Sequence, residues 1–378
     1  MTEIYKGLVG VTVDETTVSK VMVETNSLTY RGYAVQDLAA HCRFEEVAYL
    51  ILNGELPTPD QLDAFNAQER AARSVDDRMI NTIRQFSTDA HPMDTIRTCV
   101  SQMGTNADDN WSHEPEKLMF HSIEMLAKIP TCVAADYRVR KGLEPIAPNP
   151  DLGFSENFFH MCFGEVPPEE VIRCFDISLT LYAEHSFNAS TFTARVIASS
   201  LADIYGAVTG AIASLKGPLH GGANEAVMHM LKDIKTVDEG KAFVQKALAE
   251  KQKIMGFGHR VYTKGDSRVP TMYQAFLDLA RVKGETELVE IHKAIWDDMV
   301  AAKGIHPNLD YPAGPAYYLM GFDIDMFTPI FVMSRITGWS AHVMEQLADN
   351  RLIRPLSAYT GAEQREVMPL DKRAMEAA

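Results

Sequence analysis

The chain has 378 residues, of which 46% are hydrophobic and 23% are charged, a balance typical of a soluble globular enzyme. This length is sufficient for two domains, or for one large core with an inserted lobe. The formal net charge of -15 disfavours nucleic acid or an anionic membrane as a partner, because both would repel such a surface. An acidic substrate would therefore need a local basic pocket.

The cysteine pattern and the first residues indicate a cytoplasmic protein. The cysteines are odd in number, widely spaced and without a C-x-x-C pair, namely Cys42, Cys99, Cys132, Cys162 and Cys174. This pattern fits reduced thiols and predicts no metal site. Residues 1–10 carry Glu3 and Lys6 and no apolar core of signal-peptide length, so we expect no export.

Taken in chain order, the first expected elements are short strands at 9–13 and 19–24. Helical periodicity dominates the rest, as the apolar spacing within 172–182 and 269–280 illustrates. The sequence therefore predicts an all-α protein with a short N-terminal β element. Proline-rich or glycine-rich breaks separate the expected helical blocks at 57–59, 142–150, 217–222, 256–258 and 307–314.

The segment 199–215 is rich in small residues, with Gly206 and Gly210 on one helical face. Small residues let helix backbones approach closely, which predicts tight helix pairing in the core or across a dimer axis. An ordinary buried helix in a monomer is the alternative. Its uncharged part, 204–215, is shorter than the roughly 20 residues that cross a bilayer, so we expect no membrane span there.

Three histidines lie at predicted helix ends or in glycine-rich turns. His185 follows the amphipathic helix of 172–182, where it would otherwise serve as a C-terminal cap. His220 precedes a helix that Asn224 is expected to cap, and Gly221 and Gly222 are expected to allow a ligand close to the backbone. An imidazole there would stay neutral near pH 7 and donate a hydrogen bond to a developing enolate oxygen. A turn histidine bonded to its own loop is the alternative.

The third histidine, His259, follows glycines at 256 and 258 and precedes Arg268 in a charged turn. Arginine pairs bidentately with carboxylates, which favours an anionic substrate. A solvated basic turn is the alternative.

Asp310 has apolar neighbours that would raise its pKa toward that of a general base, unless it is a plain turn residue. Arg335 lies in an apolar stretch, where an arginine usually has a carboxylate partner; an ion pair with Asp323, Asp325 or Glu345 is the alternative to a role in ligand binding. Arg354 lies near Asp349, with which it would otherwise form a surface ion pair.

Taken together, these arginines and histidines suit a small dicarboxylate with a carbonyl to be polarised. The sequence has no Walker A run and no G-x-G-x-x-G after a strand, which argues against nucleotide-triphosphate and dinucleotide folds.

With these residues, the chain resembles the citrate synthase family over nearly its whole length. The matching blocks follow the family order, at 7–13, 28–33 (LTYRGY), 183–190 (AEHSFNAS), 217–225, 256–268, 308–314, 334–342 and 354–361. The resemblance implies a homodimer of almost all-helical subunits. It implies a large domain of 1–220 and 316–378 and a small domain of 221–315 on the coenzyme A side of the cleft.

The resemblance also implies the reaction, a condensation of acetyl-CoA with oxaloacetate followed by hydrolysis of citryl-CoA, without a further cofactor. It makes Asp310 the base, His220 the donor to the enol oxygen and His259 the group that polarises the oxaloacetate carbonyl. The oxaloacetate ligands would be His185, Arg268, Arg335 and Arg354, the last from the partner subunit. The coenzyme A contacts would be Ile254, Met255, Gly256, Phe257, Gly258, Arg260, Lys264 and Asn308.

Two departures from the family pattern bear on function. Ser267 stands where proline is common after the aspartate, so a less rigid turn is expected. Tyr311, Pro312 and Ala313 replace a commoner Phe-Tyr-Ser, which leaves 2-methylcitrate synthase, using propionyl-CoA, as the alternative function. A non-catalytic acyl-CoA or dicarboxylate binding protein is a further alternative, which would require replaced catalytic positions. The chain begins almost directly at the core block, from which we expect a dimer without the NADH inhibition of hexameric members.

Overall fold

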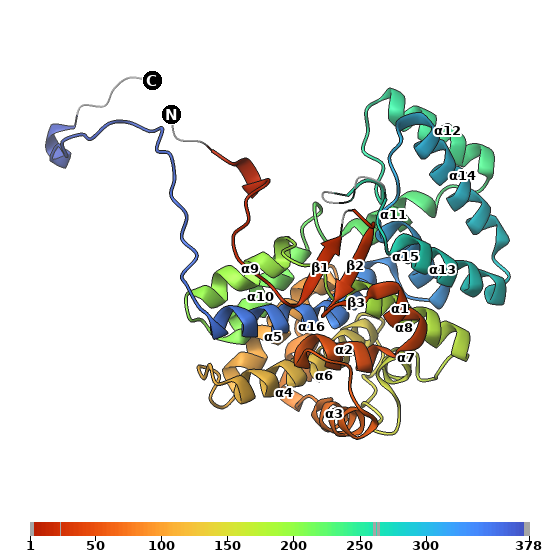
Figure 1. Ribbon diagram of the computed structural model, residues 1–378, viewed down its shortest axis with the longest axis horizontal. Coiled ribbons are helices and arrows are strands. Elements are labelled where there is room, and N and C mark those ends of the chain that lie inside the picture. The colour runs from red at the N-terminus through yellow and green to blue at the C-terminus, as the bar shows by residue number, and fades with distance from the viewer. Residues whose placement is uncertain (1–3, 23, 260–261, 263–264, 374–378) are drawn as a thin grey trace. The chain divides into compact units, whose positions relative to one another are not determined.

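A computed structural model of the protein describes residues 4–22, 24–259, 262 and 265–373 (Figure 1). The chain divides into a large compact unit, Thr16–Leu352, and a small unit formed by the described parts of Met1–Glu15 and Ile353–Ala378. The small unit contains two 3-10 turns, η1 (Lys6–Leu8) and η3 (Leu370–Lys372), and is otherwise irregular.

The large unit is built mainly from α-helices, which confirms the predicted fold class. The predicted helical segments 172–182 and 269–280 lie in α8 and α13, and 204–215 is α10 with the predicted bounds. In chain order the helices are α1 (Val35–His41), α2 (Phe44–Asn53), α3 (Pro59–Ala72), α4 (Asp77–Arg84), α5 (Pro92–Asn106), α6 (Pro115–Arg140), α7 (Phe154–Phe163), α8 (Glu169–Tyr182), α9 (Ala189–Ser199), α10 (Ile204–Leu215), α11 (Ala223–Leu231), α12 (Val237–Ala249), α13 (Val269–Lys283), α14 (Thr286–Lys303), α15 (Asp310–Met320) and α16 (Phe327–Ala348), with a 3-10 turn, η2 (Ile324–Met326), before α16.

The β element is a small antiparallel sheet of β1 (Ser19–Met22), β2 (Ser27–Tyr30) and β3 (Tyr33–Ala34). Its register pairs Ser19 with Tyr30, so these two residues lie at one end of the hairpin. The predicted strand at 19–24 is therefore confirmed in its first part. The predicted strand at 9–13 is wrong, because Gly10 adopts a φ of 76° and these residues pair with no strand of the described sheet.

The core centres on α16, which is buried along most of its length and packs against α2, α6, α8, α9 and α10. By length and composition α6 would be able to cross a membrane, but 78% of its most apolar stretch is buried inside the protein, as in a core helix. The small residues of α10 do permit close packing. A side chain at Gly210 would collide with Ile197 of α9, which explains the glycine there.

The helices α11 to α15 carry the residues that the resemblance places in a small domain. In this group α11 and α13 pack on α15, and α12 pairs with α14, as Figure 1 shows. Contacts of α13 and α15 with α8, and of α11 with α16, join this group to the rest of the large unit. The predicted boundary of the small domain stays a prediction.

Candidate active site

The structure brings six of the seven predicted catalytic and oxaloacetate-binding residues together in the large unit. His185 lies between α8 and α9, and His220 in the turn before α11, while His259 and Arg268 precede α13. Asp310 is the first residue of α15 and Arg335 lies on α16. The imidazole rings of His185 and His259 are 5.1 Å apart. The charge of Arg335 acts on His220, on His185 and on Asp310, which places them around one guanidinium.

His220 is held as a neutral imidazole. The backbone N–H of Ser190 donates to its Nε2 at 3.2 Å, and Ser190 Oγ lies 2.8 Å from the same atom. Because a backbone amide only donates, Nε2 must be the unprotonated nitrogen and the ring proton is on Nδ1. Burial, with the charge of Arg335, lowers the pKa of His220 to about 4. His220 therefore presents an Nδ1–H donor and carries no charge near pH 7.

Two details of the His220 turn differ from the sequence prediction. The helix α11 begins at Ala223 after Gly222, so Asn224 is buried in its first turn and is not the N-cap. Gly221 is needed for the chain itself, since a Cβ there would lie 2.5 Å from the carbonyl oxygen of Leu215. The expectation that Asn224 caps the helix was wrong because the N-cap is Gly222, two residues earlier, directly after the turn that Gly221 N–H and Leu215 O close at 2.9 Å.

Asp310 is a partly buried carboxyl group with one specific donor. The hydroxyl of Tyr182, at the end of α8, donates to Asp310 Oδ1 at 2.7 Å. Burial raises the pKa of Asp310 from 3.8 to about 6, although Tyr182 and the nearby arginines act in the opposite direction. The apolar neighbours Leu309 and Tyr311 are buried, which agrees with the predicted rise in the pKa of Asp310. A carboxylate with this pKa is suited to general-base chemistry near neutral pH.

The expected break at 307–314 is wrong in its second half, because α15 begins at Asp310. Pro312 falls in the first turn of that helix, where the missing N–H of proline has no intrahelical partner to lose. Asp310 is therefore held by a helix rather than by a loop.

His185 and His259 are neutral in the same pocket. Burial and the charge of Arg268 lower the pKa of His185 well below its usual value, and lower that of His259 to about 4. The ring of Tyr262 lies 4.7 Å from His259 and 5.7 Å from His185. Among the described residues, the buried Nε2 of His185 has no hydrogen-bond partner, so it is available to a ligand.

Arg268 already has a carboxylate partner within the chain. Its Nη2 donates to Asp266 Oδ2 at 2.7 Å and its Nε to Asp266 Oδ1 at 3.0 Å. Burial alone would raise the pKa of Asp266, but Arg268 outweighs it and holds that pKa well below the usual range. Asp266 also accepts the N–H of Leu309 at 3.1 Å, which ties Arg268 to the start of α15.

Arg335 is 2% exposed and, among the described residues, lacks a carboxylate within ion-pair distance. Its Nε donates to the carbonyl oxygen of Tyr182 at 2.7 Å, and its guanidinium lies 4.7 Å from the ring of Phe331. Burial lowers the pKa of Arg335 to about 10, so the group stays charged at neutral pH. A buried guanidinium in this state is suited to an anionic ligand.

The structure does not support the alternative in which Arg335 pairs with a carboxylate of its own chain. Glu345 pairs with Arg195 at 2.8 Å and Asp323 with Lys141 at 2.7 Å. Glu345 follows Arg335 on α16 by about 15 Å of helix rise, too far for an ion pair. Asp325 lies in η2, before α16 begins.

The seventh residue, Arg354, belongs to the small unit and is exposed. Its role at the site and the alternative ion pair with Asp349 therefore stay predictions.

The predicted coenzyme A segment forms one structured loop with 306–308. Gly258 N–H donates to His306 O at 2.8 Å, and Asn308 donates through its N–H to Gly256 O and through Nδ2 to Gly258 O, at 2.9 and 3.0 Å. Gly256 has a φ of 81° and a Cβ there would lie 2.6 Å from Val227. Ile254 and Phe257 are buried and Met255 is half-buried, while Arg260 and Lys264 lie outside the described residues.

Sequence reasoning missed three residues of the site, Tyr182, Ser190 and Asp266. Tyr182 fits the apolar spacing of α8, which conceals its polar hydroxyl. Ser190 reaches His220 across the fold, so no local pattern reveals the contact. Asp266 is two residues from Arg268, and this spacing was the one available signal. In the described part of the chain, no group of three or more His, Cys, Asp and Glu side chains is placed to hold a metal ion.

The fold and the site indicate an enzyme, because they combine a carboxyl group with a raised pKa, neutral histidines and buried arginines suited to an anionic ligand. The family model described as "Citrate synthase, C-terminal domain" matches residues 7–356. The chain belongs to the citrate synthase family, and it is an acyltransferase of the kind that condenses an acyl-CoA with oxaloacetate.

Relatives with both family activities are similar to the chain to nearly the same degree. A 2-methylcitrate synthase of Mycobacterium tuberculosis is 55% identical over 97% of this chain and 93% of its own length. A citrate synthase of Mycolicibacterium smegmatis is 54% identical over 97% of each chain. Among solved structures, the citrate synthase of Thermoplasma acidophilum in a ternary complex with carboxymethyl coenzyme A and oxaloacetate has a TM-score of 0.93. It is 32% identical over 99% of this chain and all of that one.

Proposed function

We propose that the protein condenses acetyl-CoA with oxaloacetate and hydrolyses the resulting citryl-CoA to citrate and coenzyme A. The observation that carries this proposal is the presence, within the influence of Arg335, of Asp310, whose carboxyl pKa is raised to about 6, and of His220, a neutral Nδ1–H donor. A base and a donor of this kind are needed to remove a proton from the carbon next to a thioester.

In the proposed reaction, Asp310 accepts a proton from the acetyl methyl group while His220 Nδ1–H hydrogen-bonds the thioester oxygen on which charge develops. The enol carbon then forms a bond to the carbonyl carbon of oxaloacetate, and the carbonyl oxygen becomes a hydroxyl with the help of His259. Water next attacks the thioester carbonyl of citryl-CoA, and coenzyme A leaves as the thiol. Neutral donors suit this role because they stabilise developing charge without first surrendering a proton.

The oxaloacetate ligands in this proposal are His185, Arg268, Arg335 and Arg354. The unpartnered Nε2 of His185 and the buried guanidinium of Arg335 support it, since both groups are available to an anion. For coenzyme A, the loop of Ile254, Met255, Gly256, Phe257 and Gly258, held by Asn308, would meet the adenine. Arg260 and Lys264 would meet phosphates.

The proposed assembly is a homodimer in which each chain contributes Arg354 to the site of its partner. Large apolar side chains of the C-terminal segment are exposed, including Leu356 at 90%, Tyr359 at 79% and Val367 at 86%. Exposed apolar groups on one segment are typical of a surface that another chain covers. The division into a large domain of 1–220 and 316–378 and a small domain of 221–315 is part of the same proposal.

The acyl preference is the open choice within this reaction. One methyl group in an apolar pocket changes the discrimination between substrates by about 1 to 3 kcal/mol, so one site accepts both acetyl-CoA and propionyl-CoA. The similar identities to a citrate synthase and to a 2-methylcitrate synthase favour this dual use. We therefore propose acetyl-CoA as the main substrate, with propionyl-CoA as the second.

A thiol-release assay with oxaloacetate and each acyl-CoA tests the proposal. Release from both thioesters, dependent on oxaloacetate, is expected, and kcat/KM ranks them. An enzyme that releases thiol from propionyl-CoA alone would be a 2-methylcitrate synthase instead. Absence of release from either would favour a binding protein without catalysis.

The same proposal places the enzyme in the cytoplasm and assigns it no cofactor beyond the coenzyme A thioester that it consumes. All five cysteines are free and buried, which supports a reducing compartment.

A further inference from the structure

The turn that carries His185 is anchored by Tyr30 of the N-terminal hairpin. The buried hydroxyl of Tyr30 lies 3.1 Å from Thr180 O, 3.3 Å from Leu181 O and 3.0 Å from Glu184 O. Thr180 and Leu181 are in the last turn of α8, where carbonyl oxygens lack the regular helical donor; Thr180 O also accepts the N–H of Ala183, and Leu181 O also accepts Nη1 of Arg268, both at 3.4 Å. Burial raises the pKa of Tyr30, so its hydroxyl remains a donor at neutral pH. One side chain of β2 thus fixes both the end of α8 and the residue before His185.

Ser19, paired with Tyr30 in the hairpin, anchors the other side of His185. Its Oγ accepts the N–H of Ser186 at 2.9 Å and donates to Glu184 Oε1 at 2.9 Å. Ser186 has a φ of 50°, a left-handed conformation that costs a residue other than glycine roughly 1 kcal/mol or more. This conformation persists only where the surroundings hold it, and Ser19 supplies one of the contacts that do.

A buried polar chain completes the support from the side of α16. His342 Nε2 lies 2.8 Å from Glu184 Oε1, and Arg195 Nη1 lies 3.2 Å from His342 Nδ1. Burial would raise the pKa of Glu184, but His342, Arg335 and Ser19 outweigh it and hold that pKa below its usual value. Glu184 is thus held as a carboxylate by His342, Arg335 and Ser19.

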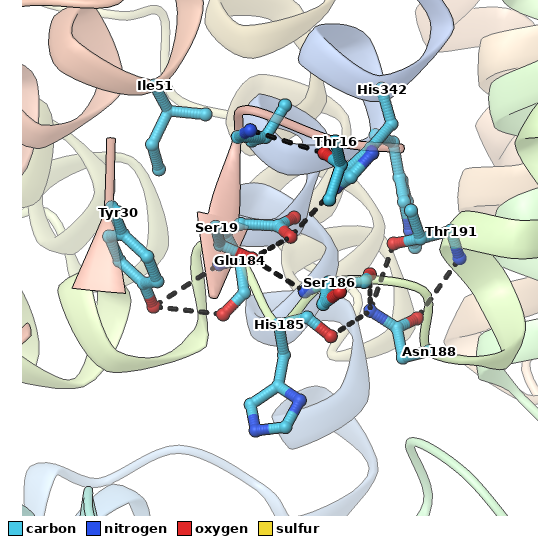
Figure 2. A network of polar contacts seen from close by, with 12 residues as sticks. Thr16, Ser19, Tyr30, Ile51, Glu184, His185, Ser186, Asn188, Thr191 and His342 are labelled. Carbon is cyan, nitrogen blue, oxygen red and sulfur yellow. Dashed lines mark hydrogen bonds and ion pairs between the residues drawn. The ribbon is translucent and has the colours of Figure 1, made fainter. Parts of the chain in front are cut away.

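The His185 imidazole itself takes no part in this network. Figure 2 shows the polar contacts gathered around Ser19, Glu184 and Ser186, while the ring of His185 extends away from them. Its Nε2 has no partner among the described residues. The ring packs beside His259 and Tyr262, and the main chain on its two sides, residues 184 and 186, is held by Tyr30 and Ser19.

We propose that Tyr30 and Ser19 are positioning residues for oxaloacetate binding, because they fix the main chain on both sides of His185. The proposal rests on the proposed function, in which His185 binds oxaloacetate. Neither residue touches the reacting atoms. The N-terminal hairpin is thus a functional part of the oxaloacetate site as well as a part of the fold.

The test replaces Tyr30 with phenylalanine, which keeps the ring in the core and removes only the hydroxyl. Loss of a hydrogen bond to buried carbonyl oxygens is expected to raise the KM for oxaloacetate about 5- to 10-fold. The KM for acetyl-CoA at saturating oxaloacetate and kcat should change less than about twofold, the pattern of lost ground-state binding. Tyr33→Phe is the matched control, since Tyr33 lies in β3 of the same sheet and its hydroxyl donates to the exposed Glu55 at 3.1 Å.

A purely structural role for Tyr30 would lower the melting temperature and leave the KM for oxaloacetate unchanged, and this result would overturn the proposal. If Tyr30→Phe does not fold, Ser19→Ala gives the same readout, with Ser27→Ala at the far end of the hairpin as its control. In both cases the assay of the wild-type enzyme distinguishes failure of the proposed function from failure of the positioning role alone. A wild type that releases no thiol refutes the proposed function, whereas an active wild type with unaltered variants refutes only the positioning role.

Discussion

Replacing Tyr182 with phenylalanine removes the hydroxyl that donates to Asp310 Oδ1 at 2.7 Å and leaves the ring packed on Phe331. A hydrogen bond to a charged acceptor contributes about 1.5 to 3 kcal/mol. Since about 1.4 kcal/mol corresponds to one pKa unit, the pKa of Asp310 should rise from about 6 to about 7 or slightly higher. Removing a hydrogen-bond donor to an ionised carboxylate always raises the pKa of that carboxyl group.

The assay is the pH dependence of kcat/KM for acetyl-CoA at saturating oxaloacetate. Asp310 must be ionised to accept a proton, so activity falls as the pH falls through its pKa. The acidic limb should move upward by about one pH unit in Tyr182→Phe, leaving roughly a fifth of the wild-type rate at the wild-type midpoint. The difference between the two proteins is the readout, because bound oxaloacetate acts on the midpoint of both.

Other groups at the site do not account for such a limb. Burial lowers the pKa of His220 and of His259 to about 4, below the range of interest. Tyr311→Phe is the control, because the Tyr311 hydroxyl donates to the carbonyl oxygen of His292 at 2.8 Å and not to Asp310. An acidic limb at the same pH in Tyr182→Phe and in the wild type would refute the assignment of Asp310 as the base.

Two further substitutions test the base and the shared site. Asp310→Asn should abolish thiol release and stabilise the fold at pH 8, because raising the pKa from 3.8 to about 6 costs the buried ionised form about 3 kcal/mol. The stability that a neutral Asp310 provides is complete below pH 3.8 and is lost as the pH rises through about 6. The melting-temperature difference between variant and wild type should therefore shrink on acidification, and a constant difference would contradict the burial argument. Arg354→Ala should raise the KM for oxaloacetate, and a mixed dimer of an Arg354→Ala chain with an Asp310→Asn chain should regain about half of the wild-type activity. Such a dimer has one intact site only if Arg354 acts in the partner's site, so an inactive mixed dimer would show that Arg354 serves its own chain.

The groups proposed to meet the substrate could be singled out because their surroundings are unusual in sequence. His220 and His259 lie in glycine-rich turns, and Arg335 interrupts an apolar run. Such placements are unusual for residues that serve only the fold. The apolar neighbours of Asp310 likewise indicated a raised pKa, which its burial in the structure explains.

The groups that hold those residues in place were not predictable, because their contacts span the fold. Tyr30 lies 154 positions from Glu184, and Tyr182 lies 128 from Asp310. In the sequence, Tyr30 and Tyr182 occupy apolar positions of a strand and a helix. Their hydroxyl groups find hydrogen-bond partners only when elements distant in sequence come together in the fold. The sequence likewise does not reveal that Glu345, a candidate partner of Arg335, lies about 15 Å from it along α16.

The central claim is that a neutral His220 donates through Nδ1 while Asp310 removes the proton. The most direct measurement is the ¹⁵N NMR spectrum of His220 in the complex with oxaloacetate and carboxymethyl coenzyme A, a thioether that is not turned over. A neutral ring with its proton on Nδ1 and an unprotonated Nε2 is expected, because the Ser190 amide donates to Nε2 at 3.2 Å. An imidazolium ring, or a neutral ring protonated on Nε2, would contradict the account.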